Sequence, residues 1–320
     1  MLPFLHTIEN EFEQVNARII DSLHSDETLV ENIGHYIVAA GGKRLRPILV
    51  LLSAASFAPF DDKHVELATI IEFIHTATLL HDDVVDLSQL RRGRATANAK
   101  WGNAPSVLVG DFLYSRSFQL MVGIGNMHIM ELMAKTTNVI AEGEVQQLAH
   151  AKSPQISEEK YFEVIYKKTA ALFEAACEGG AIIGGASADE REKMRRYGYH
   201  LGMAFQLVDD LLDYGGTTAN LGKNVGDDLA EGKMTLPLIH ALQGCSDSDA
   251  DFIREAIAAG GSRDFERVLN IVQAQGSLDY THTRAAEHVG HSLSCLEALS
   301  NSPYVQAMRD LANYSISRST

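Results

Sequence analysis

The stretch LHDDVVD at 80–86 closes a long apolar run, and FQLVDDLLD at 205–213 closes a second one in the same pattern. Both apolar runs have the spacing of helices. On a helix, carboxylates at positions i, i+1 and i+4 gather at one end of one face, where they repel one another. A hard divalent cation offsets this repulsion because it binds carboxylate oxygens. The two clusters therefore predict bound Mg²⁺ ions, and these in turn predict a polyanionic ligand such as a diphosphate.

Two aspartate clusters in one chain are stronger evidence for metal binding than one. A single cluster of this kind is often only a solvated helix end, whereas two clusters, each at the end of an apolar helix, favour metal binding. His75 precedes Asp82 by about two helical turns, and Gln206 precedes Asp209 by about one. Both side chains are therefore expected on the same face as the neighbouring carboxylates.

Helical periodicity dominates the rest of the chain, and Asn-Gly or Asp-Gly hairpin signals are absent. We expect Pro47 at the first position of its helix and Asp189 as the N-cap of another. The sequence predicts one all-α domain over residues 1–320, with long helices around a central cavity. The expected helices are 5–23, 27–39, 47–56, 64–85, 104–122, 127–150, 157–185, 189–213, 234–243, 248–258, 263–274, 278–298 and 303–317.

Composition narrows the classes of partner. The 320 residues carry a formal net charge of −15, which argues against nucleic acid and anionic membrane as partners. Cys177, Cys245 and Cys295 are scattered and form no disulfide framework, which suits a reducing cytosol. The first residues do not have the pattern of a signal peptide, and the longest apolar stretch is too short to span a bilayer. The expectation is a cytoplasmic protein without stable membrane insertion.

Cations follow or precede the aspartate clusters in three segments expected to be loops. Residues 40–47, AGGKRLRP, place two glycines and three cations at a helix start, which suits a phosphate. Residues 87–100 contain the run RRGR directly after the first cluster. Residues 215–233 contain Lys223 and Lys233 after the second cluster. Lys168 and Thr169 interrupt an otherwise apolar helix and could be either an amphipathic edge or part of a site.

In combination, these motifs strongly resemble the trans-prenyltransferases, the polyprenyl diphosphate synthases. The residues that carry the resemblance are GGKRLRP at 41–47, EFIHTATLL at 72–80, the two aspartate stretches, and LGKNVGDD at 221–228. The motifs lie between about 37 and 238, and the similarity is greatest to the bacterial octaprenyl diphosphate synthases, which make the ubiquinone side chain. The resemblance implies the all-helical isoprenoid-synthase fold, a homodimer and Mg²⁺ dependence. The C-terminal third, from about Cys245, carries no motif that adds to it.

The resemblance also implies roles for individual residues. Asp82 and Asp86 would bind two Mg²⁺ ions and Asp209 a third, with Asp83 and Asp213 as further members of the metal clusters. Isopentenyl diphosphate would bind without metal to Lys43, Arg46, His75 and Arg92. The allylic diphosphate would be contacted by Arg91, Lys168, Thr169, Gln206, Lys223 and Lys233. Within that set, the catalytic residues would be Lys168, Thr169 and Gln206, which stabilise the departing diphosphate and the positive charge left behind.

Product length is expected to depend on the helix that ends in the first cluster. Ala77 and Thr78 lie about one turn before Asp82, and both are small, so a tunnel there would stay open to a long product. Phe73, Met121 and Met133 are candidates for its distal floor. An octaprenyl product is expected, with geranylgeranyl, heptaprenyl or solanesyl diphosphate as alternatives.

Two other classes of protein are alternatives to this interpretation. A terpene cyclase would have no use for a second diphosphate site, so Lys43, Arg46 and Arg92 argue against it. A non-catalytic partner subunit of a heteromeric synthase would be expected to lack one aspartate cluster.

Overall fold

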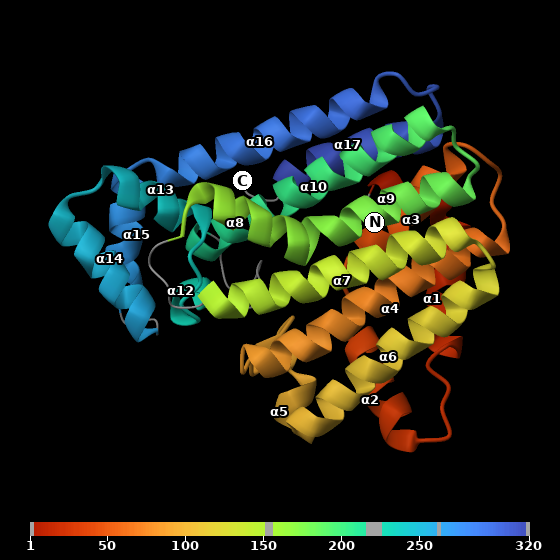
Figure 1. Cartoon of the computed structure of the whole chain (residues 1–320), viewed down its shortest axis with the longest axis horizontal. Helices are drawn as coiled ribbons and strands as arrows, with labels where there is room; N and C mark the ends of the chain where they lie inside the picture. Colours follow the sequence, from red (N-terminus) through yellow and green to blue (C-terminus); the bar gives the residue numbers. More distant parts are fainter. Residues whose placement is uncertain (1–2, 151–155, 216–225, 261–263, 318–320) are drawn as a thin grey trace. The chain divides into compact units, whose positions relative to one another are not determined.

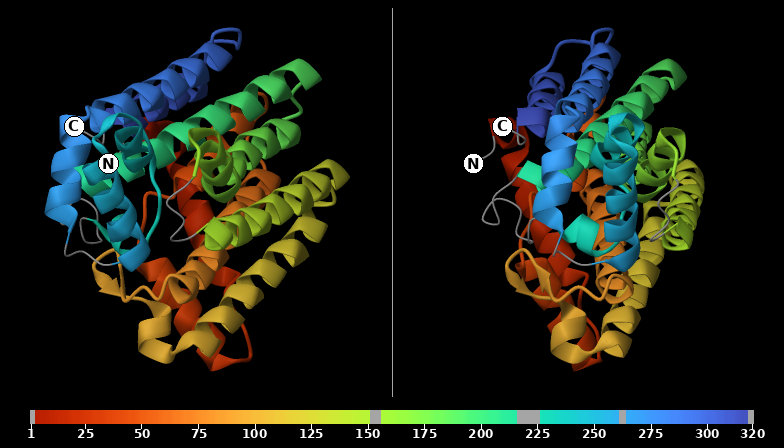
Figure 2. Two further views of the ribbon diagram at one scale, coloured as in Figure 1. Left: turned by 60° about the vertical axis from the view of Figure 1, so that its left-hand side comes forward. Right: turned by 90° about the vertical axis from the view of Figure 1, so that its left-hand side faces the viewer.

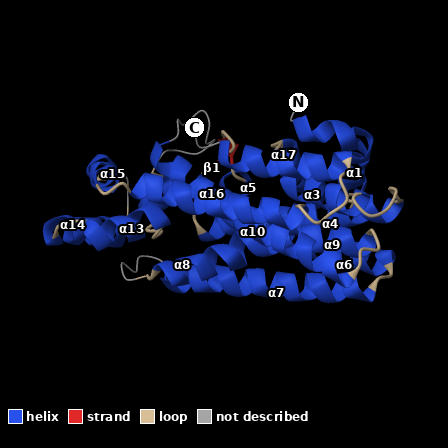
Figure 3. Cartoon of the chain, turned by 90° about the horizontal axis from the view of Figure 1, so that it is seen from above, coloured by secondary structure: helices blue, strands red, loops and turns tan. Residues whose placement is uncertain are grey.

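The computed structural model describes residues 3–150, 156–215, 226–260 and 264–317 and is almost entirely helical (Figures 1 and 3). Its helices are α1 Glu9–Asp21, α2 Thr28–Ala39, α3 Leu45–Ala55, α4 Asp62–Val85, α5 Ala97–Trp101, α6 Asn103–Ile124, α7 Met127–His150, α8 Glu158–Ile165, α9 Ala171–Ile183, α10 Ala188–Gly215, α12 Asp227–Ala230, α13 Leu236–Gly244, α14 Asp247–Ala259, α15 Phe265–Ala274, α16 Ser277–Leu296 and α17 Pro303–Ser317. A 3₁₀ helix, Pro3–Ile8, precedes α1, and a π-helical turn, Tyr166–Ala170, joins α8 to α9. The all-α prediction is confirmed. No helix in these ranges is long and apolar enough to cross a membrane.

The backbone clusters into two compact units, each built from separate stretches of chain. The first comprises Met1–Thr137, Leu172–Gly198 and Cys295–Leu311. The second comprises Asn138–Ala171, Tyr199–Ser294 and Ala312–Thr320. Neither unit is a continuous segment of the chain, so the two units are not sequential domains. A single domain over residues 1–320 stays a prediction.

Helix α4 is the central element of the first unit, where it packs against α1, α3, α5 and α6 (Figure 2). Asp61 begins it with a capping box, in which its carboxylate accepts from the backbone N–H groups of Lys63 and His64. Behind this cap, α4 buries many apolar side chains along its length, among them Ile70, Phe73 and Leu80. Because its far end carries the first aspartate cluster, this packing holds the cluster on a rigid support.

In the second unit, α13 packs against α8, α14 and α15. A buried cluster joins Tyr161 of α8 to Leu207 and Val208 of α10 and to Ile239 of α13. These contacts fix the turn of α10 that carries the second aspartate cluster.

Several expected boundaries were wrong. Pro47 is the third residue of α3, which begins at Leu45 after Arg44, a residue in the left-handed conformation with φ 46°. The cap before α10 is Ser187, whose hydroxyl accepts from the backbone N–H of Glu190, and Asp189 lies inside the first turn. The single helix expected over 157–185 is α8, the π-turn and α9 in succession.

The segment 87–100 was expected to be a loop, but it contains a short antiparallel hairpin followed by α5. The strands are β1 Leu90–Arg91 and β2 Arg94–Ala95, with Leu90 paired to Ala95. Arg92 and Gly93 form the turn at φ 53° and 72°. Positive φ at both turn positions matches the twist of a two-residue hairpin. The hairpin holds Arg92 at a fixed place, at the cost of a backbone conformation that a non-glycine residue rarely adopts.

Candidate active site

The first aspartate cluster presents its three carboxylates to different surroundings. Asp82 and Asp86 lie one turn apart at the end of α4, and both are partly exposed. Asp83 is fully buried, and its carboxylate accepts from Arg91 Nε at 2.9 Å and Arg91 Nη2 at 2.8 Å. Burial raises the pKa of Asp83, and the Arg91 charge opposes that rise. Asp82 and Asp86 can therefore reach a metal ion, whereas Asp83 serves to anchor Arg91.

The donor chemistry of these residues fits Mg²⁺. Carboxylate oxygens are hard ligands, and Mg²⁺ is usually held by one or two carboxylates together with water and substrate phosphates. Among the described residues, no three His, Cys, Asp or Glu side chains are arranged as a ready-made metal cage. Metal binding by Asp82 and Asp86 would thus leave positions open for phosphate oxygens.

A cluster of arginines lies beside the middle of α4, at Glu72 and His75. Arg44 contacts Glu72 at 3.9 Å, and Arg46 Nη1 lies 3.3 Å from His75 Nε2. Arg92 also lies against the loop before α3, since a Cβ added at Gly42 would meet its guanidinium at 2.6 Å. Two segments far apart in sequence, residues 41–46 at the start of α3 and the hairpin, therefore converge on one cationic site.

Burial and the neighbouring arginines shift the pKa values of two groups in this cluster, His75 and Glu72. Burial, followed by the charges of Arg46, Arg92 and Arg91, holds the pKa of His75 well below its usual 6.5. His75 is therefore neutral at pH 7 and can take part in hydrogen bonds without adding charge. Burial raises the pKa of Glu72, while Arg44 and the other arginines oppose that rise. Cations outnumber the one carboxylate here, so the cluster favours an anionic ligand.

The second aspartate cluster also divides into exposed and buried members. Asp209 is partly exposed. Asp210 is 3% exposed, and Asp213 is fully buried. Asp213 Oδ2 accepts from the backbone N–H of Asp228 at 3.2 Å, which ties α10 to the start of α12. Asp209 is thus the member of this cluster best placed to bind metal.

The π-turn Tyr166–Ala170 carries the predicted Lys168 and Thr169. Such turns are rare and occur often at functional sites. Lys168 Nζ forms an ion pair with Glu144 at 3.0 Å. Thr169 Oγ1 donates to Gln206 Oε1 at 2.7 Å, and Gln206 Nε2 donates to Asp210 Oδ1 at 2.8 Å. The structure thus brings Thr169 and Gln206 into direct contact.

The positions of the remaining predicted residues discriminate less between a role in the site and ordinary packing. Lys43 is exposed in the loop before α3, and Lys233 pairs with Glu231 at 2.5 Å. Lys223 lies outside the described residues. Thr78 is partly buried and donates to the carbonyl of His75 at 2.8 Å. The other predicted chain-length residues share deep burial, which fits both a tunnel wall and ordinary core packing; they are Phe73, Ala77, Met121 and Met133.

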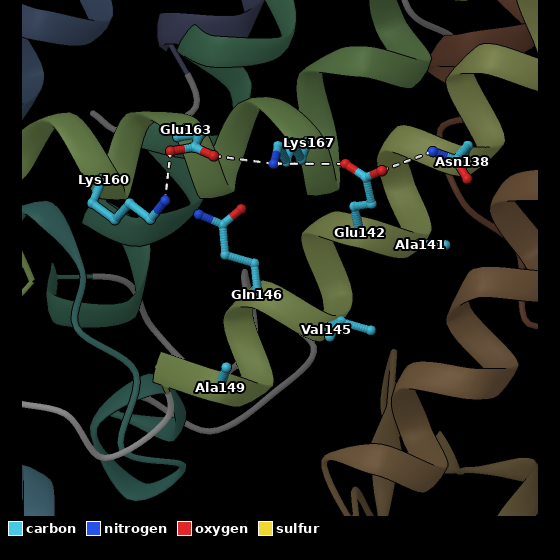
Figure 4. A pocket seen from close by; sticks show the side chains of 9 residues that line it. All are labelled: Asn138, Ala141, Glu142, Val145, Gln146, Ala149, Lys160, Glu163 and Lys167. Atoms are coloured by element: carbon cyan, nitrogen blue, oxygen red, sulfur yellow. Dashed lines mark hydrogen bonds and ion pairs between the residues drawn. The ribbon is translucent and has the colours of Figure 1, made fainter.

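A groove of about 560 Å³ lies apart from the predicted residues, between α7 and α8 (Figure 4). A row of alternating charges crosses it, with Glu163 2.8 Å from Lys160 and 3.0 Å from Lys167. These lysines lower the pKa of Glu163 to about 2. Lys167 also lies 3.9 Å from Glu142, which accepts from Asn138. These charged side chains pair with one another, so the groove has the character of a helix surface stabilised by ion pairs.

The sequence analysis did not identify Arg44 and Glu72 as members of the arginine cluster, or Tyr161 as a partner of the second aspartate cluster. Arg44 belongs to the quoted GGKRLRP stretch, and Glu72 precedes His75 by one helical turn, so both had a positional signal. Tyr161 had none, because its contact with Asp210 joins α8 to α10.

Comparison with known proteins places these features in context. The family model described as polyprenyl synthetase matches residues 27–274. The octaprenyl diphosphate synthase of Escherichia coli is 50% identical over 95% of this chain and 94% of its own length. An all-trans-nonaprenyl-diphosphate synthase of Rhodobacter capsulatus is 47% identical over 98% of this chain and 97% of its own. A polyprenyl synthase of Caulobacter crescentus, solved with calcium and isoprenyl diphosphate, aligns with a TM-score of 0.96 at 43% identity, covering 99% of this chain and 97% of that one.

Proposed function

Because this chain belongs to the polyprenyl synthetase family and is a prenyltransferase, we propose that it extends an allylic diphosphate by successive condensation with isopentenyl diphosphate in a Mg²⁺-dependent reaction. The observation that carries the assignment of the second substrate is the arginine cluster around a neutral His75, because it attracts a diphosphate without metal. Isopentenyl diphosphate must not ionise, and a site built from cations alone binds it without promoting loss of its diphosphate.

The residue roles follow from exposure and charge. Asp82 and Asp86 bind Mg²⁺, and so does Asp209, whereas the buried Asp83 and Asp213 hold Arg91 and α12 in place. Arg91, Lys168 and Lys233 contact the allylic diphosphate, as does Lys223. Lys43, Arg46 and Arg92, with His75, contact isopentenyl diphosphate. Bound Mg²⁺ would stabilise the negative charge that develops on the departing diphosphate.

The reaction breaks the bond between the allylic carbon and its diphosphate oxygen. The double bond of isopentenyl diphosphate supplies the electron pair for the new carbon–carbon bond. A proton then leaves the adduct and restores a double bond, and the released diphosphate accepts it. Thr169 and Gln206 present oxygen dipoles to the developing positive charge, where a charged base would be alkylated instead.

The assay is purified chain with farnesyl diphosphate, isopentenyl diphosphate and Mg²⁺. Arg92→Ala should raise the KM for isopentenyl diphosphate about 10- to 100-fold with a smaller change in kcat, since one charge-assisted contact is lost. Arg94→Ala is the matched control, because Arg94 lies on the same hairpin but over the Tyr36 ring at 4.5 Å. An unchanged KM in Arg92→Ala would remove Arg92 from the site, and an inactive single chain would favour the partner-subunit alternative.

We further propose an octaprenyl product made for a quinone side chain, supported by the 50% identity to octaprenyl diphosphate synthases. The nonaprenyl synthase at 47% identity makes a longer product the nearest alternative. Mass spectrometry of the dephosphorylated product decides between them, because each unit adds a fixed mass. A homodimer and a cytosolic location complete the proposal; they rest on the resemblance and on the cysteine pattern.

A further inference from the structure

We propose that Tyr161 is a positioning residue for prenyl transfer, which sets the direction of a hydrogen-bond chain that ends at Thr169. This inference rests on the proposed function, because Thr169 and Gln206 matter here as the oxygens offered to the developing cation. Tyr161 lies on α8 and is 3% exposed. Among the described residues, no side-chain hydrogen bond or ion pair joins it to those proposed to contact either diphosphate, and it has no role in the reaction described above.

The hydrogen-bond chain consists of three consecutive short bonds within the second unit. Tyr161 Oη donates to Asp210 Oδ2 at 2.5 Å. Gln206 Nε2 donates to the other carboxylate oxygen, Oδ1, at 2.8 Å. Thr169 Oγ1 donates to Gln206 Oε1 at 2.7 Å. Asp210, a buried member of the second aspartate cluster, therefore connects to the π-turn through the Gln206 amide.

The carboxylate determines the direction of every bond in this chain. Both carboxylate oxygens of Asp210 accept, Oδ2 from Tyr161 and Oδ1 from Gln206, so the Gln206 amide turns its nitrogen toward Asp210. The flipped amide would place its carbonyl oxygen against a carboxylate oxygen. With the nitrogen so placed, the carbonyl faces Thr169, and Thr169 donates its only proton to it. Thr169 and Gln206 can then present only oxygen lone pairs to a third group. The lone pairs are the negative end of each dipole, which stabilises positive charge.

Tyr161 keeps the carboxylate in this role. A buried charge is costly unless donors satisfy it, and the phenol supplies one at short distance. Burial raises the pKa of Tyr161 well above its ordinary 10, and the charge of Asp210 adds to the rise. The phenol therefore keeps its proton and stays a donor. Its ring packs edge-on against Phe162 at 5.4 Å, a contact that does not need the hydroxyl.

The test compares two Tyr→Phe variants in single-turnover measurements of the first condensation. Tyr161→Phe should lower the rate constant roughly 10- to 100-fold, the scale of a misplaced catalytic group, while the KM for isopentenyl diphosphate stays unchanged. Tyr280→Phe is the matched control, since Tyr280 donates to the Glu158 carboxylate at 2.8 and 3.0 Å in the same unit. It should keep the wild-type rate. A wild-type rate in Tyr161→Phe would overturn the positioning role and leave the proposed function standing.

A double-mutant cycle separates positioning from a general structural effect. If Tyr161 acts through Thr169, adding Tyr161→Phe to Thr169→Val should cost almost nothing further. Losses that multiply would overturn the proposal. A wild-type rate in Thr169→Val alone would overturn the role of the oxygen pair and the positioning role with it, although metal-dependent condensation would remain. Asp210→Asn is a second test should Tyr161→Phe fold poorly, because it removes the acceptor-only group and should reproduce the loss; a wild-type rate there would also contradict the proposal.

Discussion

Adjacent residues of the same type take opposite roles in this chain. Asp82 is partly exposed while Asp83 is buried against Arg91, and Asp209 and Asp210 differ in the same way. The resemblance named Asp82, Asp86 and Asp209 as metal ligands and added Asp83 and Asp213 as further members of the metal clusters, but the motif alone does not show which side of a helix faces the protein. Successive helical residues point about 100° apart, so packing against neighbouring elements decides which carboxylate is available to metal.

Ala77 provides the test of product length at this scale. Ala77→Tyr should shorten the product by several units while the first condensations continue, because a phenol one turn before Asp82 would block a growing chain without touching its diphosphate. Ala77 is only 1% exposed, so overpacking should also cost about 1–3 kcal/mol of unfolding free energy. Mass spectrometry of the product and urea unfolding measure the two effects. A destabilised variant that still makes the wild-type length would show that Ala77 is core only.

At the scale of elements, most helices were predictable, whereas the shortest elements, α5, α12, the hairpin and the π-turn, were not. The sequence placed α4 at 64–85 and α10 at 189–213, close to Asp62–Val85 and Ala188–Gly215. It missed the hairpin because Arg92-Gly93 is not a usual turn pair, and only contacts such as the one with Gly42 justify Arg92 at positive φ. It missed the π-turn because the extra residue in that turn has no local signature; the Thr169–Gln206 bond forms across elements.

The close approach of α9 to α3 predicts opposite effects for one substitution at two sites. A Cβ at Gly180 would lie 2.6 Å from the carbonyl oxygen of Val50, whereas a Cβ at Gly290 of α16 would meet nothing within 4 Å. Gly180→Ala should therefore lower the unfolding free energy by about 1–3 kcal/mol. Gly290→Ala should raise it by up to about 1 kcal/mol through helix propensity. Urea denaturation measures both, and equal effects would refute the close packing.

The contact between α10 and α16 predicts an acid-sensitive element. His200 Nδ1 lies 3.0 Å from His288 Nδ1, and burial, then the charges of Arg284 and His291, lowers the pKa of His288 to about 4. The unfolded chain takes up this proton near pH 6.5, before the folded chain does. The unfolding free energy should therefore fall as pH drops from about 6.5 to about 4.

His288→Gln should flatten that dependence, because the buried site no longer titrates. His282→Gln on the same helix is the control and should leave the slope as in the wild type, since six residues along a helix place His282 on a different face. Urea unfolding at several pH values between 4 and 7 gives the slopes. A wild-type slope in His288→Gln would assign the acid sensitivity to other groups.

For the whole molecule, folding and metal chemistry depend on different residues. The core consists of fully buried apolar side chains such as Ile48, Leu113 and Met308. The proposed metal ligands Asp82, Asp86 and Asp209 are partly exposed and lie outside it. Fold class was therefore predictable from helical periodicity, whereas the contacts of the buried Asp83 with Arg91 and of Asp213 with the start of α12 required the packed structure.

This separation predicts that chelation stops catalysis without unfolding the protein. EDTA should abolish condensation because the departing diphosphate loses its charge stabilisation, and added Mg²⁺ should restore it. The unfolding free energy should change by no more than about 1 kcal/mol, the scale of exposed charge interactions. Paired activity and urea-unfolding measurements at one EDTA concentration test both halves. Condensation that continues in EDTA would rule out the metal mechanism, and cooperative unfolding by EDTA would show that metal is part of the folded core.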